Sequence, residues 1–494
     1  MVRLTLPAAL IAVCTALSPA WGWAQAASPE PAFSHCEIEG TGGVARRFAE
    51  CASLTVAENP NAPDGRTLDL AITRIATPAA QPAADAVLVI NGGPGGSSIE
   101  LLADFWPVFA SLGTERDVIA MDQRGTGASR RLACPELEEG PTDPDDTDAI
   151  DRAVDECLTS FDADTRYYTT SVAVHDIDAV RDALGYEQLT VYGVSYGTRV
   201  AQHYARQYPD RTRAVILDGV VPPDVSLVTP VALNSAEALD DLFERCARDE
   251  ACTEAFADPN GSLSNVRQHL EAQSRVSVSF SHPVTNEPTE YEITYDHFAS
   301  IIRFMLYAPE SSAAVPLTID RAAREHDFRP IAAQAMLTLE RIAGSMASGM
   351  HNSVMCTEDY PFATLDDETL ARLEETYLTA GLAEGIDALC SRWPRGTMDA
   401  NLRDPLTTDL PVLVLSGEHD PITPPGWGEA IMPGLANARH LIAPGQGHGV
   451  IARGCVPKLA ARFINELELS ELDESCLEDL VPFPFFTDLL GPAP

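Results

Sequence analysis

The chain of 494 residues carries 33 Lys and Arg against 73 Asp and Glu, which gives a formal net charge of −40. This excess of carboxylates argues against nucleic acid or an anionic membrane surface as a partner, because both are bound through clustered cations. Hydrophobic residues make up 45% and charged residues 21% of the chain. The composition therefore excludes a disordered chain and a membrane bundle, and the length favours two packed units over one.

The N-terminus has the pattern of a secretory signal peptide. Arg3 is followed by an apolar run over residues 4–20 and by the small-residue exit Ala24-Gln25-Ala26, so we expect residues 1–26 to be removed. The alternative is a transmembrane anchor, but prolines interrupt the run and it is shorter than the roughly 20 apolar residues that a span needs. The sequence therefore predicts a periplasmic or secreted protein.

Cysteines support the same compartment. Ten remain when Cys14 of the leader is set aside, and an even number in an exported protein suggests disulfides. Metal binding is the alternative, but the sequence contains no CxxC or HxxH spacing that would support it. We expect each cysteine to pair with its neighbour in sequence: Cys36 with Cys51, Cys134 with Cys157, Cys246 with Cys252, Cys356 with Cys390, and Cys455 with Cys476.

Short apolar strands alternate with helical patterns in two separate regions of the chain. This alternation is typical of a mostly parallel sheet covered by helices on both faces. Eight strands are expected, at 51–56, 67–75, 86–90, 117–121, 189–192, 214–217, 411–416 and 439–442.

The middle of the chain lacks this alternation. Residues 224–405 are largely helical, with Ala-rich stretches, and we expect a helical cap inserted between two strands of one sheet. An independent middle domain is the alternative. We favour the insertion because the strands on both sides of it form one alternating series, so the core is expected to consist of residues 27–223 and 406–494.

The sharpest chemical signal is Gly193-Val194-Ser195-Tyr196-Gly197. It follows a predicted strand and opens a predicted helix, which is the context of a nucleophile elbow. In such a turn the serine lies at a helix N-terminus, where developing negative charge is favoured. The motif therefore predicts that Ser195 is a nucleophile, and a Gly-Ser turn without a role is the alternative.

A serine hydroxyl needs a base to take its proton, and the base is oriented by a carboxylate in the chain order Ser, Asp, His. Asp420 and His448 each follow a late predicted strand, and His448 lies in a glycine-rich turn. Glu418 and His419 are rivals for the two roles. We favour Asp420 because it stands before Pro421, in a turn that can direct its side chain across the sheet edge.

The loop Gly92–Gly96 also follows a predicted strand. Its glycines let backbone N–H groups approach a ligand, as an oxyanion hole requires. We expect the N–H of Tyr196 to act with that of Gly93, or else of Gly92. A phosphate loop is the alternative, but no Lys-Ser or Lys-Thr follows and a nucleotide is not expected.

The runs GGPGGSS, DQRGTGAS, GVSYGT, GEHDPITPP and GQGHGV, in this order, resemble the exported tripeptidyl aminopeptidase and proline iminopeptidase branch of the α/β-hydrolases. The resemblance covers nearly all of the mature chain. It departs at Asn91, where proline iminopeptidases typically carry His, and this favours the tripeptidyl type. In similar exopeptidases an acidic residue of the cap holds the free N-terminal amine of the substrate, and the resemblance implies this role for Glu358.

These inferences combine into an expected serine exopeptidase of the α/β-hydrolase fold. Small peptides are the expected substrates. Short peptides, with tripeptides as the expected size, or single residues would be released from their free N-termini through an acyl-enzyme, with neither a metal nor a cofactor. A carboxylesterase or other acyl hydrolase with the same triad is the alternative, since fold and triad do not determine the leaving group. A non-catalytic binding protein would be expected to have lost a triad member, and the sequence retains all three.

Overall fold

The computed structural model describes residues 31–138 and 149–492, so the expected signal segment lies outside the described residues. A central sheet runs in the order β1-β2-β3-β5-β4-β6-β7-β10-β11. In this order the strands β5, β4, β6, β7, β10 and β11 pair in parallel, whereas β1, β2 and β3 are antiparallel to their neighbours. The strands are β1 Ser34–Glu39, β2 Arg46–Ala57, β3 Thr67–Ile75, β4 Ala86–Ile90, β5 Val118–Met121, β6 Leu189–Val194, β7 Thr212–Asp218, β10 Thr408–Gly417 and β11 Leu435–Ala443.

The expected mostly parallel sheet is confirmed, but the central sheet of the described residues has nine strands and not eight. The additional strand is β1, which lies at one edge and pairs with the first half of β2. Most side chains of β1 are exposed or half-exposed, so it has no apolar run that would reveal it in the sequence. A disulfide between Cys36 and Cys51 joins it to β2.

Helices cover both faces of this sheet. The side chains of β4, β5 and nearly all of β6 and β7 are buried, as expected for parallel strands between two helical layers. One layer consists of α5 Thr170–Ala183 and α6 Tyr196–Gln207. The other consists of α1 Ser98–Asp104, α2 Trp106–Leu112 and α18 Val456–Glu466. The remaining core helices are α3 Pro135–Glu138, α4 Ala149–Ser160 and α17 Pro425–Ile431.

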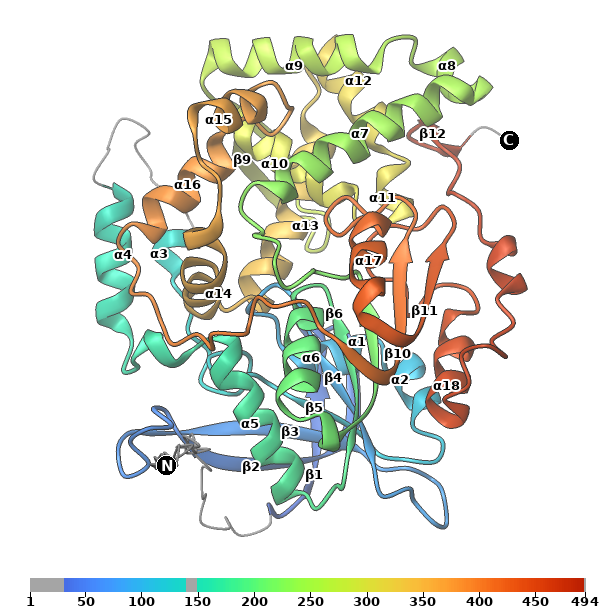
Figure 1. Cartoon of the computed structure of the whole chain (residues 1–494). Helices are drawn as coiled ribbons and strands as arrows, with labels where there is room; N and C mark the ends of the chain where they lie inside the picture. The colour runs from blue at the N-terminus through green and yellow to red at the C-terminus, as the bar shows by residue number, and fades with distance from the viewer. Residues whose placement is uncertain (1–30, 139–148, 493–494) are drawn as a thin grey trace, which may run out of the picture.

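The long connection between the paired strands β7 and β10 is mainly helical (Figure 1). We refer to residues 224–405 as the cap. It also contains a hairpin of β8 Val276–Ser281 and β9 Pro288–Ile293, which the sequence did not reveal because most of its side chains are exposed. The cap helices are α7 Pro230–Arg248, α8 Glu250–Ala255, α9 Pro259–Gln273, α10 Tyr295–Met305, α11 Pro309–Ser312, α12 Val315–Glu325, α13 Arg329–Ser345, α14 Ser348–Val354, α15 Asp367–Glu374 and α16 Gly381–Cys390.

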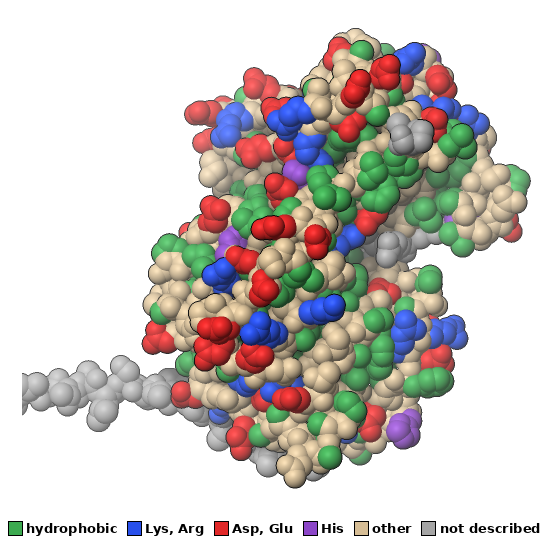
Figure 2. Space-filling model, turned by 90° about the vertical axis from the view of Figure 1, so that its right-hand side faces the viewer, with side chains coloured by type: hydrophobic (Ala, Val, Ile, Leu, Met, Phe, Trp, Pro, Cys, Tyr) green, Lys and Arg blue, Asp and Glu red, His purple; other side chains and the backbone are tan. Residues whose placement is uncertain are grey.

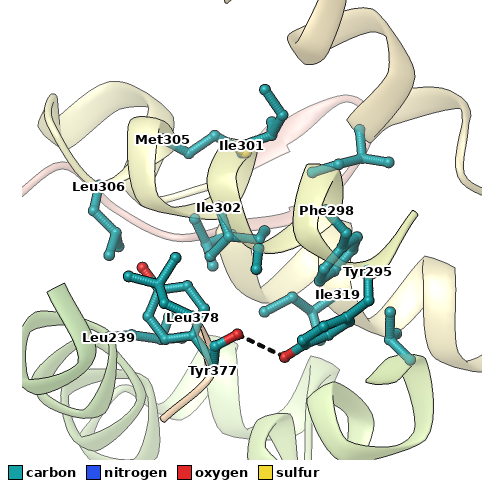
Figure 3. Packing of buried hydrophobic residues seen from close by; sticks show 14 of the residues in the cluster. Leu239, Tyr295, Phe298, Ile301, Ile302, Met305, Leu306, Ile319, Tyr377 and Leu378 are labelled. Carbon is teal, nitrogen blue, oxygen red and sulfur yellow. Dashed lines mark hydrogen bonds between the residues drawn. The ribbon is translucent and has the colours of Figure 1, made fainter. Parts of the chain in front are cut away.

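The cap has a hydrophobic core of its own, in which α10 is central (Figure 3). Phe298, Ile301, Ile302 and Met305 of this helix are buried, and their spacing places them on one face. The Tyr295 hydroxyl donates to the Tyr377 carbonyl at 2.8 Å. This packing fixes α10, so the residues on its other face have defined positions on the side away from the hydrophobic core of the cap.

Five disulfides join the cysteines in the neighbouring pairs expected from the sequence. On the face drawn in Figure 2, acidic and basic side chains are intermingled and do not form a single basic patch. Within residues 31–138 and 149–492, no helix combines the length and apolar character needed to cross a bilayer. A short hairpin, β12 Phe486–Asp488 with β13 Gly491–Pro492, ends the described chain.

Candidate active site

Ser195 lies on a tight turn between β6 and α6. Its backbone has φ 57° and ψ −128°, a conformation that L-residues seldom adopt outside functional turns. Its N–H donates to the Asp218 carbonyl at 2.9 Å, which fixes the turn against the end of β7. The strand–turn–helix context predicted from the sequence is therefore present, and Ser195 precedes the first turn of α6.

The glycines on each side of this turn allow very close packing. A Cβ on Gly193 would collide with the Gly197 carbonyl oxygen, and one on Gly197 would lie 2.6 Å from the Ile90 carbonyl oxygen of β4. Real Cβ atoms essentially never come within 3.0 Å of such atoms. The two glycines are thus required for α6 to start directly against the ends of β4 and β6.

The structure brings His448 and Asp420 together across 28 residues of sequence. His448 Nδ1 lies 2.8 Å from Asp420 Oδ2, in the turns that follow β11 and β10. The Asp420 carboxylate also accepts the backbone N–H groups of Ile422 and Thr423, each at 2.9 Å. The Thr423 hydroxyl donates to Asp420 Oδ2 at 2.7 Å and lies 3.1 Å from His448 Nδ1. Thr423 is a residue that the sequence analysis missed.

The electrostatics of His448 suit a base held by a carboxylate. Burial lowers the pKa of the imidazole, but the charge and hydrogen bond of Asp420 and the charge of Asp218 outweigh burial, so the pKa lies above its ordinary value. The rivals lie elsewhere. Glu418 accepts the Gly445 N–H at 2.8 Å, and His419 Nδ1 lies 2.8 Å from Asp241 Oδ2.

The loop after β4 lies directly against the nucleophile. A Cβ on Gly92 would lie 2.6 Å from Ser195 Cβ. The Gly92 N–H donates to Asn91 Oδ1 at 2.7 Å, whereas no described residue accepts from the Gly93 N–H. Tyr196 is the first residue of α6, so its N–H has no acceptor within the helix. This arrangement leaves Gly93 and Tyr196 as N–H donors beside Ser195.

A cavity of about 460 Å³ opens above Ser195 and His448. Core residues form its floor, and the cap supplies its other walls, through α7, α10, α16 and the segment around α14. Most of the lining is apolar, with polar side chains such as Asn91, Arg303 and His351. The volume is within the range of small-ligand pockets.

Asp218 connects the turn of Ser195 to the turn of His448 and was not identified from the sequence. Its carboxylate accepts the Val450 N–H at 2.8 Å, the Ile451 N–H at 2.9 Å and the Tyr192 hydroxyl at 2.9 Å. The signal that could have revealed it is an acidic residue directly after the apolar strand residues 214–217. Its carboxylate is buried with its acceptor sites used by the protein.

Glu358 lies in a π-helical turn, Met355–Asp359, and is fully buried. Its carboxylate accepts the Thr170 N–H and the Thr170 hydroxyl, both at 2.7 Å. The Thr170 hydroxyl also lies 2.6 Å from the Tyr196 hydroxyl. Glu358 of the cap therefore accepts hydrogen bonds at the N-terminus of α5. Through the Thr170 hydroxyl it also connects to Tyr196, the residue that follows Ser195.

Glu358 does not line the cavity, so the structure does not bring it to Ser195 as the expected amine ligand. Burial raises its pKa to about 7, against the opposing charge of Arg199. Arg199 of α6 forms a bidentate pair with the neighbouring Asp359, at 2.8 and 2.9 Å. The two adjacent carboxylates therefore fasten the cap to α5 and α6.

The cap also touches the oxyanion loop. The Ala347 N–H donates to the Gly95 carbonyl at 2.9 Å, and His351 Nδ1 donates to the Pro94 carbonyl at 3.0 Å. Burial lowers the pKa of His351. Within the described ranges no group of three or more His, Cys, Asp or Glu side chains is arranged to hold a metal ion.

The family described as the alpha/beta hydrolase fold matches residues 85–452. The chain belongs to this family. The hydrolase is 27% identical to the putative hydrolase YuaR of Escherichia coli strain K12 over 425 residues, which is 80% of each chain.

Two other relatives have names that state an activity. The hydrolase is 25% identical to the serine protease Hip1 of Mycobacterium tuberculosis strain H37Rv over 453 residues, 84% of this chain and 85% of that one. It is 29% identical to a tripeptidyl aminopeptidase of Streptomyces lividans over 191 residues, 35% and 36% of the two chains. The resemblance on which the sequence analysis relied is confirmed at the level of the family and its peptidase relatives.

Proposed function

We propose that this hydrolase is an exported serine exopeptidase that releases short peptides, with tripeptides as the expected size, or single residues from free N-termini. The main support is one relationship: Ser195 on its strained turn and His448, which is paired with Asp420, line the same cap-covered cavity. A nucleophile, an orienting carboxylate and a base in this chain order on an α/β-hydrolase sheet are the constellation for acyl transfer.

In the proposed reaction, Ser195 Oγ attacks the scissile carbonyl carbon while His448 takes its proton. Asp420 occupies Nδ1 of the imidazole, so Nε2 is the nitrogen that receives the proton and later gives it to the leaving amine. In the second half-reaction, water attacks the acyl carbon while His448 takes its proton. His448 then returns this proton to Ser195 Oγ as the acyl group leaves. The N–H groups of Gly93 and Tyr196 hold the oxyanion that forms in each half-reaction.

The cap supports an exopeptidase over an endopeptidase. Side chains from several cap helices, among them Val231, Phe304 and Leu382, wall the cavity on the side away from the sheet. A space of about 460 Å³ suits a short chain end and not a continuous folded strand of a protein. The names of the Hip1 and tripeptidyl aminopeptidase relatives support peptides as the substrates.

The five disulfides support export.

A second candidate is a carboxylesterase or related acyl hydrolase that uses the same residues. One observation favours it: the described lining of the cavity offers no carboxylate for a substrate ammonium. Asp218 is the acidic residue of the lining, and its carboxylate already accepts three N–H or O–H groups. Glu358 is buried outside the cavity.

A substrate panel tests the proposal. Free and N-blocked aminoacyl, dipeptidyl and tripeptidyl anilides would be compared with short acyl esters by their kcat/KM. We expect free tripeptidyl anilides to be the best substrates. Equal turnover of free and blocked peptides would remove the N-terminal requirement, and activity on esters alone would establish the second candidate.

The Ser195→Ala variant links any activity to this site. Removing the nucleophile of a serine triad reduces kcat by about 10⁶-fold, so hydrolysis of every substrate in the panel should be lost. Retention of activity in this variant, shown to be folded by circular dichroism, would place the reaction elsewhere.

A further inference from the structure

Arg303 is the cationic residue of the cavity lining, and its position follows from the packing of α10. Residues 298, 301, 302 and 305 of this helix face the cap core, so Arg303 and Phe304 fall on the opposite side. Both line the cavity together with Ser195 and His448. The sequence gives a usable signal, because an arginine interrupts the apolar run Ile301-Ile302-Arg303-Phe304-Met305.

No carboxylate of the described residues forms an ion pair with Arg303. Several other arginines that are half-buried or more, such as Arg199 and Arg321, pair with Asp or Glu. Arg206 and Arg403 instead donate to backbone carbonyls outside the cavity lining. The Asp218 carboxylate also lines the cavity, but it accepts the backbone N–H groups of Val450 and Ile451 and the Tyr192 hydroxyl. In a chain with a net charge of −40, a cation at the catalytic cavity without a carboxylate partner requires an explanation.

Local contacts hold Arg303 without neutralising it. It lies in the last turn of α10, where a positive charge interacts favourably with the helix dipole. Its guanidinium carbon lies 4.6 Å from the centre of the Phe304 ring, which fixes one face of the planar group. A guanidinium has five N–H donors in its plane. Stacking on a ring uses none of them, and the hydrogen bond to the Tyr307 hydroxyl leaves the others available.

Hydroxyl groups add to the donors around Arg303. Tyr377 is more than nine-tenths buried, and its hydroxyl has no hydrogen-bond partner among the described residues. Burial raises the pKa values of Tyr307 and Tyr377, and the nearby charge of Arg303 opposes both shifts. Tyr307 lines the cavity and Tyr377 does not, so the wall around α10 offers the Arg303 guanidinium and the Tyr307 hydroxyl as donors to an anion.

We propose that Arg303 binds a carboxylate of the substrate inside the catalytic cavity, so that the enzyme prefers short peptides with an anionic group near the scissile bond. This inference rests on the proposed acyl hydrolysis at Ser195 and names its substrate class. The carboxylate can come from two sources, an acidic side chain or the free C-terminus of a very short peptide. A buried charged pair of this kind discriminates strongly against a neutral isostere, which would leave the guanidinium without a partner.

Matched substrates test the inference. Tripeptidyl anilides with Glu or Gln at each position in turn isolate the side chain, and short peptides with a free or amidated C-terminus isolate the terminal carboxylate. We expect the anionic member of at least one pair to have a kcat/KM about 10- to 100-fold higher than its neutral isostere. Arg303→Gln should reduce this ratio to about one, and Arg303→Lys should retain part of it.

Arg372→Gln serves as the control, since Arg372 is an exposed arginine of cap helix α15 that does not line the cavity. It should leave the ratio unchanged. A wild-type enzyme without preference in either pair, or a preference that survives Arg303→Gln, would overturn the inference.

A binding measurement separates this inference from the proposed function. Calorimetric titration of the Ser195→Ala protein with the same anionic and amidated peptides requires no turnover. Arg303-dependent binding of the anionic peptide, together with a wild-type enzyme that hydrolyses no peptide of the panel, would sustain the anion site and refute the exopeptidase. Equal binding of both peptides, in an enzyme that cleaves them, would refute the anion site alone.

Discussion

The carboxylate of Asp218 accepts the backbone N–H of Val450 at 2.8 Å, two residues after His448. The carbonyl of the same aspartate accepts the N–H of Ser195 at 2.9 Å. One residue at the end of β7 therefore holds both the nucleophile turn and the turn that carries the base. Asp218 is a positioning residue in this arrangement, since it acts through the backbone of its neighbours.

Asp218→Asn should lower kcat while leaving the fold intact. An amide can present only one oxygen to the two N–H groups of Val450 and Ile451, so the His448 turn should shift, and displacements of about 1 Å cost about 10²-fold in rate. The change also removes a charge that raises the pKa of His448. We therefore expect the acid limb of the kcat/KM profile to move to lower pH, and an unmoved limb would indicate a purely structural role.

The pH dependence of the wild-type enzyme follows from His448. The base acts in its neutral form, so kcat/KM should fall as the imidazole protonates, with a midpoint above the ordinary value of about 6.5. Asp420→Asn should lower kcat by about 10⁴-fold and shift this midpoint to lower pH, because the charge that favours the imidazolium is lost. A profile measured with one anilide substrate from pH 4 to 9 checks both effects.

Gly92→Ala should impair catalysis through the approach of the oxyanion loop to Ser195. The added Cβ would lie 2.6 Å from Ser195 Cβ and 2.9 Å from the Val194 carbonyl oxygen, so the loop must move away. Loss of an oxyanion donor costs about 10²- to 10³-fold in kcat, and we expect a decrease of this order with little change in KM.

Gly385→Ala is the matched control for that substitution. Gly385 lies on an exposed part of α16, and nothing lies within 4 Å of its added Cβ. This variant should keep full activity and gain about 0.5–1 kcal/mol in the free energy of unfolding, because alanine favours the helix. A comparable loss of kcat in both variants would contradict the steric argument.

Glu358 should make stability depend on pH. Its pKa in the folded protein is about 7 against 4.5 for an ordinary glutamate, so between these values the folded state binds more protons than the unfolded state. The free energy of unfolding should therefore fall as pH rises through this window, by on the order of 3 kcal/mol. Glu358→Gln should remove this dependence in denaturant titrations at pH 4.5 and pH 8, whereas the same change at the exposed Glu384 should not.

Glu358→Ala tests the capping contact itself. It would leave the Thr170 N–H and hydroxyl without their acceptor in a buried site, which costs about 1–3 kcal/mol for each group. Stability should fall well below that of Glu358→Gln. If Glu358 instead bound the substrate amine, both variants would raise KM for free peptides with little effect on unfolding.

Local patterns in the sequence were sufficient for the scaffold and for proposing the three triad residues. Ser195, Asp420 and His448 each follow an apolar strand, and the ends of parallel strands meet at one edge of a sheet. Strand β1 and the β8–β9 hairpin were missed because their side chains are mostly exposed. An edge or surface strand carries no continuous apolar run to reveal it.

The tertiary structure decided what surrounds the triad. The resemblance implies that Glu358 binds a substrate amine, and the packing of the cap against α5 places its carboxylate on Thr170. The positions of Arg303 and Asp218 depend on contacts between segments far apart in the sequence. The spacing of residues along the chain gives no information about these contacts. The sequence determines the chemistry of a side chain, whereas the folded chain determines which partner that side chain contacts.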